Sequence, residues 1–143
     1  MRIALIAAQM VVRILGSIMI ILGLLFWSGN ALALIPVHMT IGLLLVLTLW
    51  TIGVLAARSG EQPGLVALAI VWGFVVPILG YSQDSLLPGP AHWLIQVVHL
   101  LVGLTAIGLA ETLARRALIR LSLWEWIKPR AARVRGAYEI KRS

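Results

Sequence analysis

The chain has 143 residues, of which 61% are hydrophobic and 12% charged, and its formal net charge is +7. Its mean hydropathy of +1.00 is too high for a soluble domain, so composition predicts a multi-pass membrane protein. The absence of cysteine excludes disulfides, thiolate metal sites, cysteine nucleophiles and a covalently attached c-type haem. Nine of the twelve Lys and Arg residues lie from Arg115 onward, so the charge indicates membrane topology rather than nucleic-acid binding.

Four apolar segments are each long enough to cross a hydrocarbon core of roughly 30 Å. They cover residues 5–27, 32–57, 64–81 and 91–113. The connections between them are short, so consecutive helices are expected to be antiparallel neighbours. The predicted fold is an all-α, up-down-up-down bundle of four transmembrane helices.

The distribution of basic residues predicts the orientation of this bundle. The first and third connections carry no Lys or Arg, whereas the second contains Arg58 and the C-terminal segment is strongly basic. By the positive-inside rule, both termini are expected in the cytoplasm, with the inner membrane of a bacterium as the location. No small-residue cleavage site follows the first apolar stretch, which is therefore expected to be a retained helix rather than a signal peptide.

Two stretches of the sequence echo each other, because residues 37–43 and 98–104 both read V-H-x-x-x-G-L. Each lies in an apolar segment, so the histidine and the glycine four positions later share one helix face. A histidine is costly in hydrocarbon unless something binds it, and a glycine one turn away lets a flat group come close. The pattern favours one ligand clamped between two helices, with a b-type haem as the first candidate. The residues concerned are His38 with Gly42, and His99 with Gly103.

The two histidines are expected to lie at similar depth near the outer face, because the second and fourth helices run in the same direction. If Asn30 caps the second helix and Pro90 opens the fourth, their depths differ by roughly 3 Å at 1.5 Å per residue. This places Pro36 inside the second helix, which membrane helices tolerate. A helix that started at Pro36 would leave His38 too shallow.

A fainter repeat links the first and third segments. In each, two glycines lie seven positions apart and the second follows Ile-Leu; these are Gly16 and Gly23, and Gly73 and Gly80. The chain reads as a duplicated helical hairpin, whose halves are related by a pseudo-two-fold axis along the membrane normal. Such an axis brings the two histidines face to face. The alternative is coincidence, since glycine and leucine are common in this chain.

With histidines on facing membrane helices, residues 5–113 resemble the b-type cytochromes of the cytochrome b561 kind, including small bacterial superoxide-oxidase and respiratory b-subunit relatives. The resemblance implies that His38 and His99 are the axial ligands of a non-covalent haem b. It implies electron transfer, with a quinone or a redox protein as partner, by a haem-dependent oxidoreductase or a subunit of one. Those relatives commonly hold two haems, which needs four histidines; this chain has three, so one bis-histidine haem is expected.

Two further side chains are candidates for a role in the membrane. His92 lies on nearly the same helix face as His99, about 10 Å higher. It suits a hydrogen bond to a haem propionate, or an interfacial position in an aromatic belt beside Trp93. Arg13 is a charge inside the first helix and suits a quinone carbonyl, an ion pair with Glu111, or snorkelling to the cytoplasmic interface.

The chain changes character after the last apolar segment, which divides it into a transmembrane domain, 1–113, and a basic segment, 114–143. An apolar stripe beside Arg115, Arg116 and Arg120 predicts an amphipathic helix that lies in the cytoplasmic interface and is anchored by anionic lipid. This helix is expected to end at residues 128–130, around Pro129, and to be followed by a loose basic tail.

The residues alone leave two other hypotheses open. Imidazole suits copper and zinc, so His38, His92 and His99 also suit a metal site or a transporter. Alternatively, the protein is a structural membrane anchor subunit without a cofactor, whose histidines bond to neighbouring helices. No nucleophile with a base, no paired-carboxylate site and no phosphate loop is visible. The expected partners are the lipid bilayer and, as a further option, other copies of the chain in a homo-oligomer, but no nucleic acid.

Overall fold

The computed structural model describes the backbone of residues 1–140 and the side chains of residues 1–127. This part of the chain is all-helical, and its long helices are α1 Arg2–Trp27, α2 Ile35–Arg58, α3 Pro63–Ser82 and α4 His92–Ile140. The short 3-10 helices η1 Leu32–Leu34 and η2 Gln83–Ser85 precede α2 and follow α3. All four long helices are long and apolar enough to cross a membrane, which confirms the predicted helical class and the predicted number of candidate spans within the described residues.

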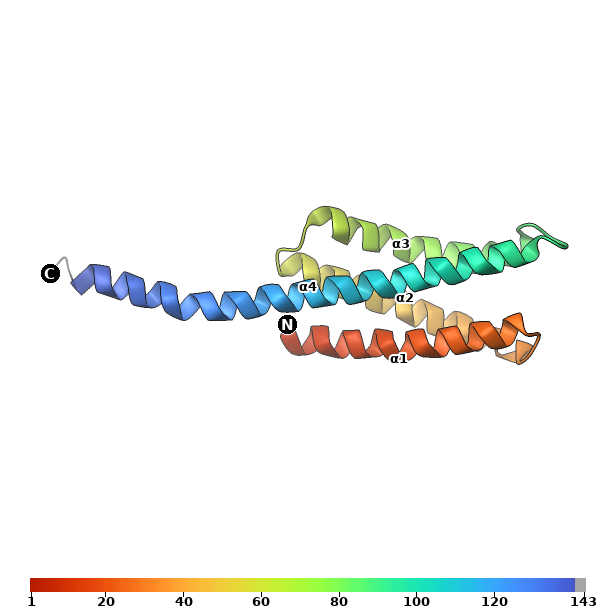
Figure 1. Ribbon diagram of the computed structural model, residues 1–143, viewed down its shortest axis with the longest axis horizontal. Helices are drawn as coiled ribbons and strands as arrows, with labels where there is room; N and C mark the ends of the chain where they lie inside the picture. The colour runs from red at the N-terminus through yellow and green to blue at the C-terminus, as the bar shows by residue number, and fades with distance from the viewer. Residues whose placement is uncertain (141–143) are drawn as a thin grey trace.

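The four helices pack into one bundle. The start of α1, the connection between α2 and α3 and the middle of α4 lie at one end, and the other two connections lie at the opposite end (Figure 1). Each helix packs against the next one along the chain, and α1 also packs against α4. Helices α2 and α4 meet across the diagonal, whereas no close backbone contact joins the described residues of α1 and α3. The diagonal contact is the one that a site between the two histidine-bearing helices requires.

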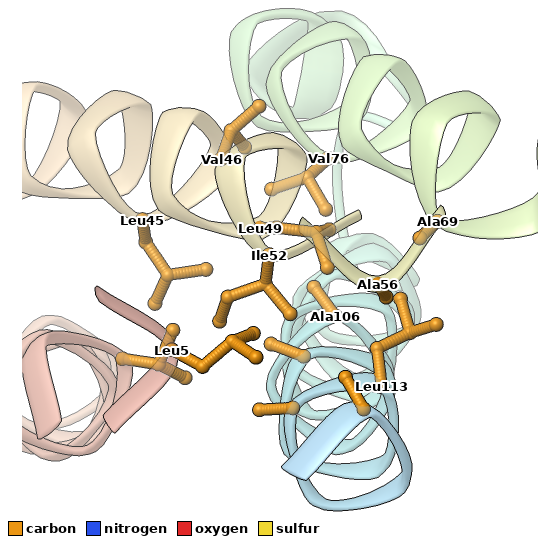
Figure 2. Packing of buried hydrophobic residues seen from close by; sticks show 14 residues of the cluster. Leu5, Leu45, Val46, Leu49, Ile52, Ala56, Ala69, Val76, Ala106 and Leu113 are labelled. Carbon is orange, nitrogen blue, oxygen red and sulfur yellow. The ribbon is translucent and has the colours of Figure 1, made fainter. Parts of the chain in front are cut away.

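Aliphatic residues from all four helices form the buried core (Figure 2). Helix α4 contributes small residues at intervals of three or four positions, which places them on one face. They are mainly Ala106, Ala110, Ala114 and Ala117. Such small side chains let membrane helices approach closely, and α4 packs against all three of the other long helices.

The core occupies only part of the length of the bundle. On α2 the first buried residue is Leu45, and on α4 it is Ala106. Each lies seven positions after a histidine, His38 or His99 respectively. At the level of the histidines, neither of these two helices therefore places a fully buried aliphatic side chain on the diagonal.

Helix α2 begins later than predicted. Residues Leu32–Leu34 form a separate 3-10 turn, and Pro36 lies in the first turn of α2, where its missing N–H would have no partner anyway. The side-chain amide of Asn30 donates to the carbonyl oxygen (3.2 Å) and the hydroxyl (3.0 Å) of Ser28, so it does not cap α2. His38 nevertheless faces His99, with 6.3 Å between the ring centres, so the start of α2 near Pro36 does not prevent the pairing.

Helix α4 is longer than predicted. It runs unbroken through residues 113 and 114 and past Pro129 to Ile140, well beyond the other helices (Figure 1). The predicted end at residues 128–130 is therefore wrong, and the basic segment is an extension of α4 rather than a separate helix. A proline removes one backbone hydrogen bond, but the alanines and arginines around it are good helix formers. Of the predicted loose tail, residues 141–143 lie outside the described residues.

A buried carboxylate ties α4 to the connection between α2 and α3. Glu61 accepts a hydrogen bond from the backbone N–H of Gln62 (3.0 Å), and it lies 3.6 Å from Arg116 Nη1 and 3.4 Å from Arg120 Nε. The Gln62 N–H and then the two guanidinium groups hold the pKa of Glu61 below its usual value, although burial opposes this. The stabilisation is therefore present above the usual carboxyl pKa and is lost as the pH falls through the lowered one.

Gly73 is expected to be essential for the packing of α3 against α2. The Trp50 indole donates to the carbonyl of Ile70 (3.1 Å) and lies so close to Gly73 that a Cβ there would overlap it. We expect Gly73→Ala to lower the free energy of unfolding by about 1–3 kcal/mol, because the indole must shift. Thermal unfolding in detergent measures the loss. Gly23→Ala is the matched control, since a Cβ at that position of α1 meets nothing within 4 Å. Equal losses in the two variants would contradict this account.

Candidate paired-histidine site

Two histidines face each other across the diagonal of the bundle. His38 lies in the first turn of α2 and His99 near the start of α4. Their ring centres are 6.3 Å apart and the ring planes are inclined at 47°. The ring of Phe26, at the end of α1, packs edge-on against His38 with a centre-to-centre distance of 5.3 Å. The structure thus brings together the two histidines that the repeated motif singled out.

Both imidazoles have unused hydrogen-bonding capacity. The side chains are half-buried, and the Nδ1 atoms of His38 and His99 are buried without a hydrogen-bond partner. A buried polar atom without a partner costs free energy, so such atoms in a folded protein call for a physical explanation. Two of them on facing rings in one cluster are consistent with a site that binds a further group.

The separation of the rings fits a metal ion held from two sides. Imidazole nitrogens bind a metal such as zinc at about 2 Å, so two rings on opposite sides of one metal have their centres about 6 Å apart. The observed separation is 6.3 Å. The two histidines therefore fit a group whose metal takes one imidazole on each side, as the iron of a bis-histidine haem does.

The two glycines of the repeated motif have different surroundings. A Cβ on Gly103 would meet nothing within 4 Å. A Cβ on Gly42 would lie 3.1 Å from Met19 Cε, so a thioether of α1 already covers that position. Gly80 of α3 packs directly against a histidine, because a Cβ there would lie 3.1 Å from His99 Cε1. The sequence pattern marked Gly80 only as part of the fainter repeat, since nothing in a single helix shows which neighbour packs on it.

His92 is not part of this pair. Its Nδ1 lies at hydrogen-bonding distance, 3.2 Å, from the carbonyl oxygen of Leu86 in the connection between α3 and α4. Within the described residues, no three His, Asp or Glu side chains come together in an arrangement that could hold a metal ion. The three-histidine metal site is therefore not formed by these residues, and the interfacial interpretation of His92 fits its contact better than a role as ligand.

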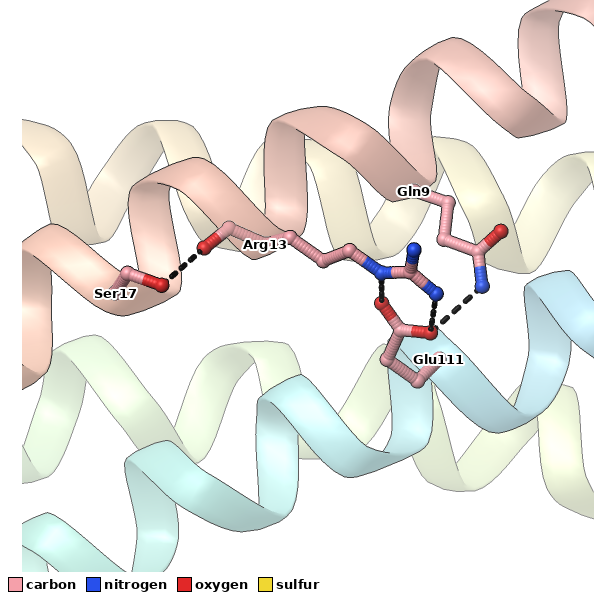
Figure 3. A network of polar contacts seen from close by, with 4 residues as sticks. All are labelled: Gln9, Arg13, Ser17 and Glu111. Atoms are coloured by element: carbon pink, nitrogen blue, oxygen red, sulfur yellow. Dashed lines mark hydrogen bonds and ion pairs between the residues drawn. The ribbon is translucent and has the colours of Figure 1, made fainter.

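The charge inside α1 forms an ion pair with α4 (Figure 3). Arg13 Nε lies 2.7 Å from Glu111 Oε1, and Nη2 lies 3.0 Å from Oε2, which is a bidentate pair. Gln9 donates to the same carboxylate at 2.6 Å. Of the three interpretations of Arg13, the pair with Glu111 is the one observed. Glu111 follows His99 by twelve residues, about 18 Å along the helix, so this network is separate from the paired-histidine site.

No family model, curated protein or solved structure matches this chain. The chain is therefore classified by its own sequence and structure. It is a helical protein with four helices able to cross a membrane, and its candidate site is the pair of facing histidines on α2 and α4.

Proposed function

We propose that this protein is a membrane b-type cytochrome in which His38 and His99 hold one non-covalent haem b between α2 and α4. The observation that carries the proposal is the facing pair of imidazoles, 6.3 Å apart, whose buried Nδ1 atoms have no partner. The start of the packed core at Leu45 and Ala106 supports it, because the space beside the rings is then free of fully buried aliphatic side chains from these two helices.

The orientation in the membrane is part of the same proposal. The chain crosses four times, up-down-up-down, with both termini in the cytoplasm and the histidine pair near the outer face. Arg58 and the basic part of α4 lie at the end of the bundle that carries the N-terminus, and the positive-inside rule assigns that end to the cytoplasm. The part of α4 at that end of the bundle, with Arg116 and Arg120, then lies at the level of the cytoplasmic lipid headgroups, and a bacterial inner membrane suits this arrangement.

In this proposal the chain supplies the ligands of the haem, side chains that line its site and a rigid support for the ligands. A bound haem contributes one-electron chemistry at its iron. His38 and His99 would both hold such a haem, which would leave no ligand position for oxygen and would favour electron transfer. Phe26 packs edge-on against His38 and limits how far that ring can turn, and Gly80 lets α3 lie close beside His99. A quinone or a redox protein is the electron partner that we propose.

The test is the spectrum of the purified full-length protein, with and without added haem. We expect a red protein that takes up one haem per chain and, on reduction, shows the sharp split bands of a low-spin, bis-imidazole haem. A colourless protein that takes up no added haem would overturn the proposal. A ratio of two haems per chain would contradict the single-site version, since the proposed pair provides ligands for only one.

Copper is the second candidate, because the same pair of imidazoles fits any metal held from two sides. Zinc is less suited, since structural zinc sites take four protein ligands and catalytic sites three. Metal analysis of the same preparation separates the cases. One copper per chain without haem would favour the second candidate, and a protein with neither group would favour a structural anchor.

A further inference from the structure

A second candidate site lies at the opposite end of the bundle from the histidines. A hollow of about 600 Å³ lies there, where α2 ends and α4 leaves the bundle, and it also borders on Met1. Two arginines line it, Arg58 at the end of α2 and Arg120 on α4, and no acidic side chain is among its described lining residues. The hollow therefore offers positive charge from two helices.

Arg58 is available to a ligand. Its side chain is exposed and has no hydrogen-bond or ion-pair partner among the side chains that the structure describes. It is not needed to cap α2 either, because the backbone N–H groups of Ser59, Gly60 and Glu61 already bond to the last carbonyls of that helix. Arg120, in contrast, already forms an ion pair with Glu61, and this pair fixes the position of Arg120 at the wall of the hollow.

Apart from Ser59 and Gly60, the rest of the lining is apolar. Leu121, Trp124 and Ile127 of α4 form much of the wall. The candidate membrane span of α1 begins at Arg2 and that of α2 ends at Arg58, so the hollow lies beside the ends of two candidate spans. Basic pockets at this level between membrane helices suit the phosphate of an anionic lipid, and an apolar wall suits the glycerol and the first carbons of its acyl chains.

We propose that this hollow binds the phosphate headgroup of one anionic phospholipid, with Arg58 and Arg120 on the phosphate and the apolar wall on the lipid backbone. The shared chemistry is that of a phosphate group, and a free phosphate ion is the other source. The lipid is favoured because a free ion would leave the apolar wall uncovered. The proposal is independent of haem, since no residue of the hollow belongs to the paired-histidine site.

Native mass spectrometry of the full-length protein in a non-ionic detergent tests the proposal. Phosphatidylglycerol and phosphatidylcholine with the same acyl chains are titrated separately. We expect one phosphatidylglycerol to bind about tenfold more tightly than phosphatidylcholine, because only the anionic lipid gains from the charge-assisted hydrogen bonds. Arg58→Gln should remove about this tenfold preference. Arg115→Gln is the matched control, since it removes the same charge from an exposed position of α4 outside the hollow.

Any one of the following results would overturn the proposal. Equal affinity for the two lipids would show that charge is not recognised, and an equal loss in Arg115→Gln would show a general basic surface without a specific site. Competition by millimolar inorganic phosphate that is as effective as phosphatidylglycerol would assign the hollow to a free ion. If Arg58→Gln does not fold, as judged by circular dichroism, Arg58→Lys replaces it and must still weaken the preference, because lysine lacks the planar fork of arginine.

Discussion

Alanine in place of His38 or His99 is expected to abolish low-spin haem binding. Each change removes one of the two facing imidazoles, and no other described His, Asp or Glu side chain joins them in a cluster that could supply a replacement ligand. Hydrogen-bonding groups around a metal site tune its ligands but do not substitute for them. Reduced-minus-oxidised spectra of the purified variants should therefore lack the split low-spin bands, while circular dichroism shows an unchanged helix content.

His92→Ala is the control for this experiment. The His92 ring contacts the carbonyl of Leu86 rather than the histidine pair, so the spectrum should remain almost unchanged. If His92→Ala loses haem while His38→Ala or His99→Ala retains it, the ligand pair must be reassigned to His92 and one of the other two. If all three variants keep the spectrum of the parent, the haem lies elsewhere and the proposed site is wrong.

The second large effect is expected at Gly80, which touches His99 from α3. Gly80→Val introduces a Cβ 3.1 Å from His99 Cε1 and adds two methyl groups beyond it, so the imidazole must move. Displacing the supports of a metal ligand typically costs about tenfold to a hundredfold in affinity. We expect a loss of haem affinity of that size, measured by titration of the haem-free protein.

Gly23→Val is the matched control for Gly80→Val. Gly23 is the corresponding glycine of the fainter repeat in α1, and a Cβ there meets nothing within 4 Å. The two changes carry the same cost in helix propensity, so only the contact with His99 distinguishes them. Equal haem affinities in the two variants would show that Gly80 does not support the ligand.

The helical class and the spans were predictable because they depend on local properties. A run of about twenty apolar residues must form a helix that satisfies its own backbone in lipid, whatever it packs against. The juxtaposition of His38 and His99 was predictable from the repeated V-H-x-x-x-G-L motif, since it marks the corresponding histidines of two helices that run in the same direction. The Arg13 pair was one of three interpretations, because the sequence does not show the distance between α1 and α4.

Other features were not accessible from the pattern of single helices. The sequence placed Gly42 and Gly103 in equivalent positions, but Met19 covers the first and nothing covers the second. The end of the last helix was also predicted wrongly, because Pro129 was expected to stop it, whereas the helix-forming residues around Pro129 continue it to Ile140. In each case the outcome depends on which neighbours are present, and a local rule does not include them.

By itself, the sequence determined that four apolar segments form helices able to cross a membrane, and it singled out His38 and His99 as the histidines that face each other. These features were accessible because hydropathy and periodicity are properties of one segment of chain. The tertiary structure alone decided that α2 and α4 meet on the diagonal while α1 and α3 stay apart. It also decided that Gly80 supports His99 and that Glu61 ties down two arginines of α4. The physical reason is that contacts between helices depend on the shapes of all four surfaces together, and those shapes exist only when the helices have packed.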